Sequence, residues 1–431
     1  MSSNKQRSSN KTHTTSLFFF DHPALSYLLK WLPLCLLIGV CTGSASAFFL
    51  QSLDLVTGYR EHHVWIIAFL PVAGFLIGCL YHYKGKESNE GNRLLIETVH
   101  RPGKIIPLMM APLVYIGTVT THLFGGAAGR EGTALQMSGA LADQFSKPFG
   151  LTGADRKILV IAAIAAGFGS VFGTPFAGAI FGVEVCFTGK IKFSALLPAL
   201  ASSLIADQVT RLWNTHHTVY PVLVLPDFSF VKFLYTVIAG IVFGLCATVF
   251  IRLIHFITAA FKSHIVYPPL RPLLGGVIVA AAVWIMGTTT YIGLGIPTIL
   301  ASFNQQMPSY SFLLKMLFTV VTLGAGFKGG EVTPLFFIGA VLGSALAAVI
   351  PLPTALLAGL GFVAVFAGAT NTPLACSIMA MELFGIECGI YTAIACFVAY
   401  FFSGKNTIYG SQKLQNEQMR YLQQKEKLDN L

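Results

Sequence analysis

The chain has 431 residues, of which 54% are hydrophobic and 11% carry a charge. A soluble domain has roughly 25% charged residues, so this chain has too few charges to cover a water-soluble globule of its length. The surplus apolar surface predicts an integral membrane protein and excludes a soluble globular one.

The formal net charge of +10 comes from basic residues near the chain ends and in short loops. Lys5, Arg7 and Lys11 precede the first apolar segment, and the loop after the second segment holds Lys84 and Lys86. Because positive residues favour the cytoplasmic side, we expect both regions in the cytoplasm. The sequence has no basic stripe on a soluble face, which excludes a nucleic-acid interface.

The chain divides into three predicted regions. Residues 1–22 predict a cytoplasmic tail. The chain is not expected to begin with a cleavable signal peptide, because the apolar stretch from Leu25 to Leu50 is too long for the core of one. Residues 23–402 predict the transmembrane transport domain, and residues 403–431 predict a short site segment followed by a cytoplasmic tail. We expect a multi-pass protein of the cell (inner) membrane with both termini in the cytoplasm.

Apolar helical segments of very different length follow one another through the transport domain. They cover residues 24–56, 64–83, 105–124, 134–146, 157–171, 175–188, 194–212, 230–262, 272–288, 311–324, 335–350, 354–368, 373–385 and 388–402. Several are shorter than the roughly 20 residues that cross a bilayer. Glycine and proline interrupt them at Gly125–Gly132, Gly169–Pro175, Gly324–Pro334 and Gly368–Pro373. Broken backbone at membrane depth is tolerated only beside a buried or watery cavity, so these breaks predict the functional interior.

Eight cysteines lie in or beside apolar runs, and none forms a CxxC pair. We interpret them as thiols packed within helices, and we expect no metal site and no cofactor. The sequence also lacks HExxH, GxSxG and paired aspartates within helices, which argues against an intramembrane enzyme.

An internal repeat relates two halves of the chain, at roughly 23–212 and 230–402. Seven residues recur 200 positions later: Gly126, Gly129, Glu131, Thr133, Leu135, Gly139 and Ala140 match Gly326, Gly329, Glu331, Thr333, Leu335, Gly339 and Ala340. The stretch TPFAGAIFGVE at 174–184 recurs 198 positions later as TPLACSIMAME at 372–382. Matching helix breaks are typical of repeat-built transporters and channels, and binding sites lie where the breaks meet.

The sequence Gly129-Arg130-Glu131-Gly132-Thr133 holds the main candidate for chemistry. Glycines let the backbone approach a small ion, and free N–H groups at a helix start attract anions. A carboxylate there competes with the anion for the same donors, and protonation makes it neutral so that it leaves. Glu131 is therefore predicted to be both gate and proton carrier. The alternative is that it caps a helix or pairs with Arg130.

These motifs resemble those of the CLC family of anion channels and transporters, over roughly residues 25–410. Gly129–Thr133 resembles the family's GREGP motif, whose Glu is the external gate, and Gly329–Pro334 resembles its second anion-binding loop. Gly91–Leu95 occupies the place of the family's GSGIP motif, and Tyr409 the place of its inner Tyr.

The resemblance implies an all-α integral membrane protein with the CLC-type fold. It implies two repeated halves, with inverted topology expected, and about 18 helices of unequal length, many of them not fully spanning. It also implies a homodimer with one ion pathway in each subunit.

The departures from the family's motifs narrow the expected function. Asn92 stands where chloride- and nitrate-selective members have Ser, and Thr133 stands where the family has Pro. Val185, directly after Glu184, occupies the place of the inner Glu that transfers protons in chloride/proton exchangers. In these respects the chain resembles the fluoride-exporting branch, whose second loop bears the Glu-Val-Thr-Pro found at 331–334. That branch couples fluoride exit to proton entry.

Fluoride is small and strongly hydrated, so its site needs closely placed donors. The predicted donors are the Asn92 amide, the backbone N–H groups of Val332 and Thr333, and the Tyr409 hydroxyl. The motif glycines beside the ion are Gly91, Gly129, Gly132, Gly329 and Gly330. Three alternatives remain: Asn92 caps a turn, Thr333 bonds within its helix, or Tyr409 anchors the protein at the membrane interface.

Glu331 is an extra carboxylate, since chloride-transporting relatives have an apolar residue at this place. A buried Glu beside an anion is costly unless it is protonated, paired or functional. We hypothesise that Glu331 excludes other anions or relays protons in place of the missing inner Glu, with an ion pair to Lys328 as the alternative. Glu184 and Glu382, at matching repeat positions, are expected to serve structure or the inner vestibule.

The sequence therefore predicts a proton-coupled fluoride exporter that protects against fluoride toxicity. The expected partners are fluoride or chloride, protons, the lipid bilayer and a second copy of the chain. The alternative within transport is a chloride/proton exchanger or a passive anion channel. The alternatives outside transport are an intramembrane enzyme and a membrane scaffold, and we expect no enzymatic activity.

Overall fold

The computed structural model describes residues 23–101, 103, 105–187, 193–221 and 225–410. Within these ranges it contains sixteen α-helices, three short 3-10 helices and no β-strand. The predicted all-α fold with helices of unequal length is therefore confirmed. The tail predicted at 1–22 lies outside the described residues, and so does the part of the predicted segment 403–431 that follows residue 410.

The α-helices are α1 (Pro23–His62), α2 (Leu70–Tyr83), α3 (Asn92–His100), α4 (Met110–Leu123), α5 (Glu131–Ala142), α6 (Gly153–Phe172), α7 (Pro175–Glu184), α8 (Phe193–Leu212), α9 (Phe230–His264), α10 (Leu270–Met286), α11 (Ile296–Asn304), α12 (Ser311–Ala325), α13 (Val332–Leu346), α14 (Thr354–Thr370), α15 (Pro373–Phe384) and α16 (Gly389–Ser403). The 3-10 helices are η1 (Val64–Phe69), η2 (Asp143–Phe145) and η3 (Ile386–Cys388).

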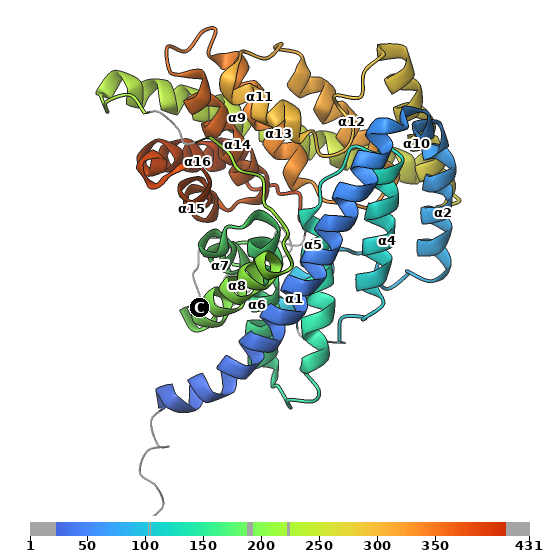
Figure 1. Cartoon of the computed structure of the whole chain (residues 1–431), viewed down its shortest axis with the longest axis vertical. Coiled ribbons are helices and arrows are strands. Elements are labelled where there is room, and N and C mark those ends of the chain that lie inside the picture. Colours follow the sequence, from blue (N-terminus) through green and yellow to red (C-terminus); the bar gives the residue numbers. More distant parts are fainter. Residues whose placement is uncertain (1–22, 102, 104, 188–192, 222–224, 411–431) are drawn as a thin grey trace, which may run out of the picture.

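Long and short apolar helices are mixed, as the sequence predicted. The five segments long and apolar enough to cross a bilayer are Ser26–His62, Val64–Tyr83, Phe193–Leu212, Phe230–His264 and Ile386–Ser403. Six further apolar helices have only 10–17 residues: α7, α10, α12, α13, α14 and α15. Figure 1 shows the long α1 running diagonally across the molecule, and it packs against α4, α5, α6 and α8.

Each predicted break lies between two helices, and local residue chemistry explains where the helices stop and restart. Gly173 (φ 72°) and Asn371 (φ 59°) end α6 and α14 in the left-handed conformation that favours glycine and asparagine. Pro175 and Pro373 then begin α7 and α15 at the first helical position, where proline's missing N–H has no cost.

Helices α7 and α15 exchange their end caps. The Glu382 carboxylate of α15 accepts hydrogen bonds from the N–H groups of Phe176 (3.0 Å) and Ala177 (2.7 Å), at the start of α7. In return, the Glu184 carboxylate accepts the N–H groups of residues 374 (3.1 Å) and 375 (2.8 Å), at the start of α15. Because each C-terminal Glu caps the other helix's N-terminus, the two helices run antiparallel. The exchange gives both carboxylates the structural role expected of them.

The backbone repeat is one residue longer at the central loops than the sequence identities indicate. Glu131 begins α5 and Val332, 201 positions later, begins α13, while Arg130 and Glu331 take the two N-cap positions. The match of Glu131 with Glu331, 200 positions apart, is therefore wrong as a structural equivalence. Glu331 occupies the place that Arg130 has in the first half.

Phenylalanines from both halves form the centre of the core. Phe168 stacks on Phe181 with ring centroids 4.2 Å apart, and Phe336 stacks on Phe362 at 3.9 Å. All four are buried, and such stacked rings add to the free energy of apolar burial. Phe336 is thus a packing residue.

Candidate anion-binding site

Two glycine-rich loops, one from each half, meet at the centre of the molecule. The N–H of Gly129 donates to the carbonyl of Gly330 (2.6 Å), and the N–H of Gly330 donates to the carbonyl of Gly129 (2.8 Å). This reciprocal pair brings the break between α4 and α5 against the break between α12 and α13. The helix starts that follow, at Glu131 and Val332, are therefore neighbours.

The Glu131 carboxylate lies inside this junction, and the side chain is fully buried. Its Oε2 accepts hydrogen bonds from the N–H groups of Thr333 (3.2 Å) and Arg130 (3.1 Å), and its Oε1 accepts the Thr333 hydroxyl. The Arg130 guanidinium nitrogen Nε is 4.0 Å from Oε1. Donors from both halves thus converge on one negative charge, which is the arrangement an anion needs.

Asn92 and Tyr409 line a small internal cavity of about 10 Å³. The remaining walls are apolar: Leu95, Ile96, Leu135, Ile164, Phe181 and Val185. A cavity of this volume holds about one particle the size of a water molecule. The structure therefore brings two predicted anion donors to one small cavity, and it places Val185 in the wall of the same cavity.

Asn92 is held close to the start of α5. A Cβ added to Gly132 would lie 2.9 Å from Nδ2 of Asn92, so only glycine permits this approach. Gly91 takes the N-cap position of α3 with φ 59°, and no side chain caps this helix. Within the described residues, the buried Oδ1 of Asn92 accepts no hydrogen bond. The alternative that Asn92 caps a turn is therefore wrong.

The structure also decides the alternatives for Thr333 and Tyr409. The Thr333 hydroxyl donates to Glu131 across the two halves, so it does not bond within its own helix. Tyr409 is 4% exposed and lies in the interior, so it is not an interface anchor. Val332 is the first residue of α13, and its N–H has no acceptor within that helix.

Glu331 and Lys328 do not form the ion pair considered from the sequence. The Lys328 ammonium donates to Oδ1 of Asn89 (2.9 Å) and lies 3.8 Å from the centre of the Tyr81 ring. Within the described residues, Oε2 of Glu331 is buried and has no hydrogen-bond partner. The ion-pair alternative is therefore wrong, and Glu331 lies at the N-cap of α13 with one carboxylate oxygen, Oε2, lacking a partner among the described residues.

Thr118 is a polar contact of the site that the sequence did not reveal. Its hydroxyl is 2.6 Å from the hydroxyl of Thr133, and both side chains are fully buried. The bond joins α4 to the first turn of α5, two residues after Glu131. A single Thr within an apolar helix carries no sequence signal, so Thr118 could be found only through its contact.

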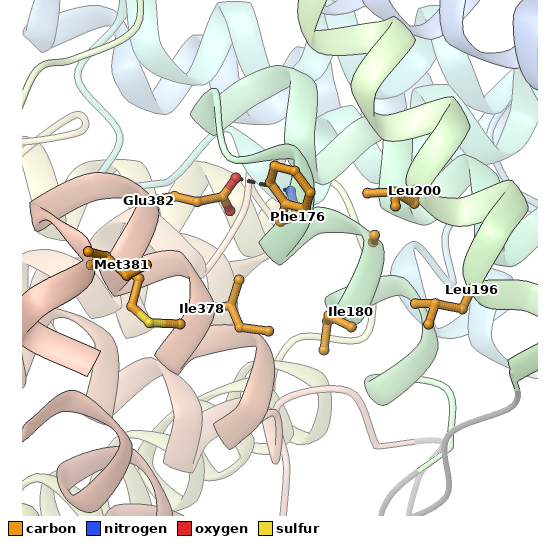
Figure 2. Close-up of a pocket in the computed structure, with 9 residues that line it drawn as sticks. Phe176, Ile180, Leu196, Leu200, Ile378, Met381 and Glu382 are labelled. Carbon is orange, nitrogen blue, oxygen red and sulfur yellow. Dashed lines mark hydrogen bonds between the residues drawn. The ribbon is translucent and has the colours of Figure 1, made fainter. Parts of the chain in front are cut away.

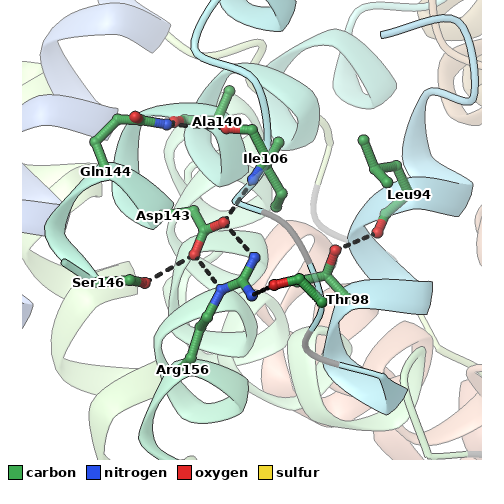
Figure 3. Close-up of polar contacts among 9 residues, drawn as sticks. Leu94, Thr98, Ile106, Ala140, Asp143, Gln144, Ser146 and Arg156 are labelled. Carbon is green, nitrogen blue, oxygen red and sulfur yellow. Dashed lines mark hydrogen bonds and ion pairs between the residues drawn. The ribbon is translucent and has the colours of Figure 1, made fainter. Parts of the chain in front are cut away.

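Helix α5 is also fixed at its other end (Figure 3). The buried Asp143 carboxylate forms a two-pronged ion pair with Arg156, with Nε–Oδ1 and Nη2–Oδ2 distances of 2.7 Å. Asp143 also accepts the N–H of Ile106 (2.7 Å), and Arg156 donates to the carbonyl of Gly103 (2.7 Å). These bonds join the α3–α4 connection to the end of α5, so both ends of this helix are held by polar contacts.

A larger groove of about 430 Å³ lies between α7, α8 and α15 (Figure 2). Its lining is apolar apart from Glu382: Phe176, Ala179, Ile180, Leu196, Leu200, Ile378, Met381 and Ile386. Glu382 already accepts the N–H groups at the start of α7. The apolar side chains offer an anion no hydrogen-bond donor to replace its hydration, and the Glu382 carboxylate is itself an acceptor, so the groove lacks the features of an anion site.

The geometry defines a multi-pass helical membrane protein in which broken helices of two repeats place converging donors in the interior. This is the architecture of a membrane transport protein. Comparison with known proteins agrees, since residues 73–404 match the family described as voltage gated chloride channel.

A relative from Pseudomonas syringae pv. tomato, named chloride/fluoride channel protein, is 52% identical over 396 residues, which cover 90% of this chain and 88% of the relative. The crystal structure of a CLC-type fluoride/proton antiporter matches with a TM-score of 0.86 and 35% identity, over 89% of this chain and 98% of that one. A slow cyanobacterial Cl⁻/H⁺ antiporter, at 19% identity, shares the fold with a TM-score of 0.74 over 90% of this chain and 98% of that one.

The chain therefore belongs to the voltage gated chloride channel family, the CLC family, as its motifs predicted. It is a multi-pass integral membrane protein for anion transport. The family consists of channels and transporters and is not a class of enzymes.

Proposed function

We propose that this protein exports fluoride across the cell membrane in exchange for protons, and so protects the cell from fluoride. The observation that carries the proposal is the placement of Glu131. Its carboxylate holds the hydroxyl and the N–H of Thr333, which are donors that a transported fluoride ion requires. In this proposal the Thr333 donors bind the Glu131 carboxylate at one stage of transport and the fluoride ion at another.

Protonation drives the exchange in this scheme. A charged carboxylate accepts strong, charge-assisted hydrogen bonds, and the neutral acid accepts weaker ones. When Glu131 gains a proton it therefore leaves the donors, and fluoride takes its place. Loss of the proton restores the charge, and the carboxylate again displaces the anion. Proton entry and fluoride exit are coupled because the charged carboxylate and the fluoride ion compete for the same hydrogen-bond donors.

The cavity between Asn92 and Tyr409 supports fluoride as the cargo. Its volume of about 10 Å³ fits one particle the size of water, which fluoride resembles and chloride exceeds. The Asn92 amide and the Tyr409 hydroxyl replace part of the lost hydration. The names of two relatives, a chloride/fluoride channel protein and a fluoride/proton antiporter, also support this cargo.

Glu331 is proposed as the second proton carrier. Val185 lines the inner cavity and cannot titrate, so this position offers protons no path. The Glu331 carboxylate lies at the N-cap of α13, next to Val332, and its buried Oε2 lacks a partner among the described residues. A carboxyl group can bind and release one proton, which the Val185 side chain cannot.

Flux measurements with purified protein in liposomes test the proposal. An outward fluoride gradient is expected to drive proton uptake, and an equal chloride gradient is not. The Glu131→Gln variant is expected to lose proton movement, because its amide cannot carry a proton. Proton-driven, uphill fluoride transport by this variant would refute the assigned role of Glu131.

The alternative is a passive channel or a chloride/proton exchanger. The word channel in the name of the 52% identical relative is the observation that favours a channel. The same liposomes distinguish these functions. Fluoride flux that follows the membrane potential without proton movement indicates a channel, and proton uptake driven by chloride indicates a chloride/proton exchanger.

We also propose a homodimer in the inner membrane, with both termini in the cytoplasm and one pathway per subunit. The family resemblance supports the dimer, and α8 offers outward apolar surface at Phe193 and Leu197. Counting photobleaching steps of labelled protein in liposomes tests the dimer. Labelling of cysteines introduced in the tails, from each side of the membrane, tests the orientation.

A further inference from the structure

We propose that Lys328 is a positioning residue that sets the spacing between the two anion-binding loops of the site. Lys328 lies in the loop Gly326–Glu331, directly before the Val332 and Thr333 donors. Its ammonium reaches across to the turn that leads to Asn92. This inference rests on the proposed function, because it assigns those loops to one fluoride pathway.

The first contact of Lys328 is with the aromatic face of Tyr81. The ammonium lies 3.8 Å from the ring centre, which is well within the range of cation–π attraction. Tyr81 is on α2 and is only 6% exposed, so water competes little for the ammonium on this side. The contact needs the ring and not the phenol hydroxyl, which allows a close control variant.

The second contact is with the turn before α3. The Lys328 ammonium donates to Oδ1 of Asn89 (2.9 Å), and Asn92 begins α3 three residues later. The same turn packs on the Tyr81 ring at Gly85, where an added Cβ would lie 2.9 Å from the ring. One side chain therefore joins the second anion-binding loop to the turn that supports Asn92.

The path of the lysine stem depends on Gly117 of α4. A Cβ at this position would lie 2.9 Å from Cγ and 3.0 Å from Cβ of Lys328. The missing side chain leaves space for the stem between α4 and the second loop. The Lys328 stem therefore passes Gly117, and the ammonium at its end contacts Tyr81 and Asn89.

The opposite side of the loop is fixed by the backbone bonds between Gly330 and Gly129. Phe327 of the same loop packs toward Gly74 of α2, and Lys328 adds a polar side-chain bridge to the α2–α3 turn. Without Lys328, the loop keeps its packing on α2 but loses its polar link to the turn that leads to Asn92, so the distance between Asn92 and the Thr333 donors is less tightly fixed. A small anion needs donors at fixed close distances, so its affinity depends on this spacing.

The test measures fluoride transport in liposomes as a function of fluoride concentration. Lys328→Met keeps the length of the stem but removes the charge, and Tyr81→Leu removes the ring. Each is expected to raise the half-saturating fluoride concentration about tenfold, with the maximal rate retained. Lys328→Arg and Tyr81→Phe keep the cation–π contact and are expected to match the wild type.

Asn89 lies on an exposed turn, so we expect substitutions at this position to leave folding intact. Asn89→Leu removes the acceptor and is expected to raise the half-saturating concentration, whereas Asn89→Asp keeps an acceptor oxygen and is not. Wild-type half-saturating concentrations in Lys328→Met, Tyr81→Leu and Asn89→Leu would overturn the proposal. So would equal losses in the conservative variants Lys328→Arg and Tyr81→Phe.

Failure of this inference is separable from failure of the proposed function. If the wild type moves chloride and not fluoride, the proposed function is wrong, and the same variants are then compared with chloride as the anion. The positioning role is supported with either anion if the half-saturating concentration rises in Lys328→Met and Tyr81→Leu but not in Lys328→Arg and Tyr81→Phe. An unchanged half-saturating concentration in Lys328→Met and Tyr81→Leu refutes the positioning role with either anion.

Discussion

Thr333 donates to the Glu131 carboxylate twice, through its backbone N–H and through its hydroxyl, although the two residues belong to opposite halves. The backbone donor cannot be removed by a side-chain change, but the hydroxyl can. The two donors can therefore be separated experimentally, and the hydroxyl tested alone.

Thr333→Val removes the hydroxyl and keeps the shape of the side chain. We expect the half-saturating fluoride concentration to rise about tenfold, because a hydrogen bond to a charged group contributes about 1.5–3 kcal/mol. Thr333→Ser retains the hydroxyl and is expected to stay close to the wild type. Fluoride flux against concentration measures both, and equal values for the Val and Ser variants would contradict the assigned hydroxyl.

Glu331→Gln tests the second proton carrier. The amide keeps the size of the side chain and cannot titrate, so we expect fluoride flux to persist with fewer protons moved per fluoride. Simultaneous recording of fluoride efflux and proton uptake measures this ratio. A wild-type ratio together with wild-type selectivity would remove Glu331 from the mechanism.

The Thr118–Thr133 pair gives a prediction on stability. Thr118→Val leaves the buried Thr133 hydroxyl without its partner, which costs about 1–3 kcal/mol. The double variant Thr118→Val/Thr133→Val removes both polar groups and is expected to recover most of that loss. Denaturant unfolding in detergent measures the cycle, and strictly additive losses would show that the two hydroxyls are not coupled.

The exchanged caps of α7 and α15 predict matched effects. Glu382→Ala and Glu184→Ala each remove a carboxylate that accepts two N–H groups, so each is expected to lower stability by about 1–2 kcal/mol. Glu387→Ala, at an exposed position nearby, serves as the control. Thermal unfolding measures all three. A loss of stability in Glu387→Ala as large as in the other two variants would show that the capping hydrogen bonds make no specific contribution to stability.

The sequence predicted the helix breaks well, because glycine and proline act locally on the backbone. Gly173, Pro175 and Pro373 end and begin helices by their own conformational limits, without help from distant residues. Helices α3 and α11 were not predicted, since nine residues with mixed polarity give too weak a periodic signal.

Contacts between distant segments were harder to predict. The sequence paired Lys328 with Glu331 because they are three residues apart, but the backbone between them is a glycine loop and not a helical turn. The true partners, Tyr81 and Asn89, lie in the other half and depend on the tertiary fold. The one-residue change in the repeat has the same origin, since Gly129 and Gly330 set the register by pairing.

The pairing of Gly129 with Gly330 uses main-chain atoms alone. The side chains of Asn92 and Thr133 take no part in these two hydrogen bonds. Substitutions at these two positions can therefore alter the preference for one anion over another and leave the backbone contact between the halves in place. Because the contact is reciprocal, a displacement of either loop displaces the other as well.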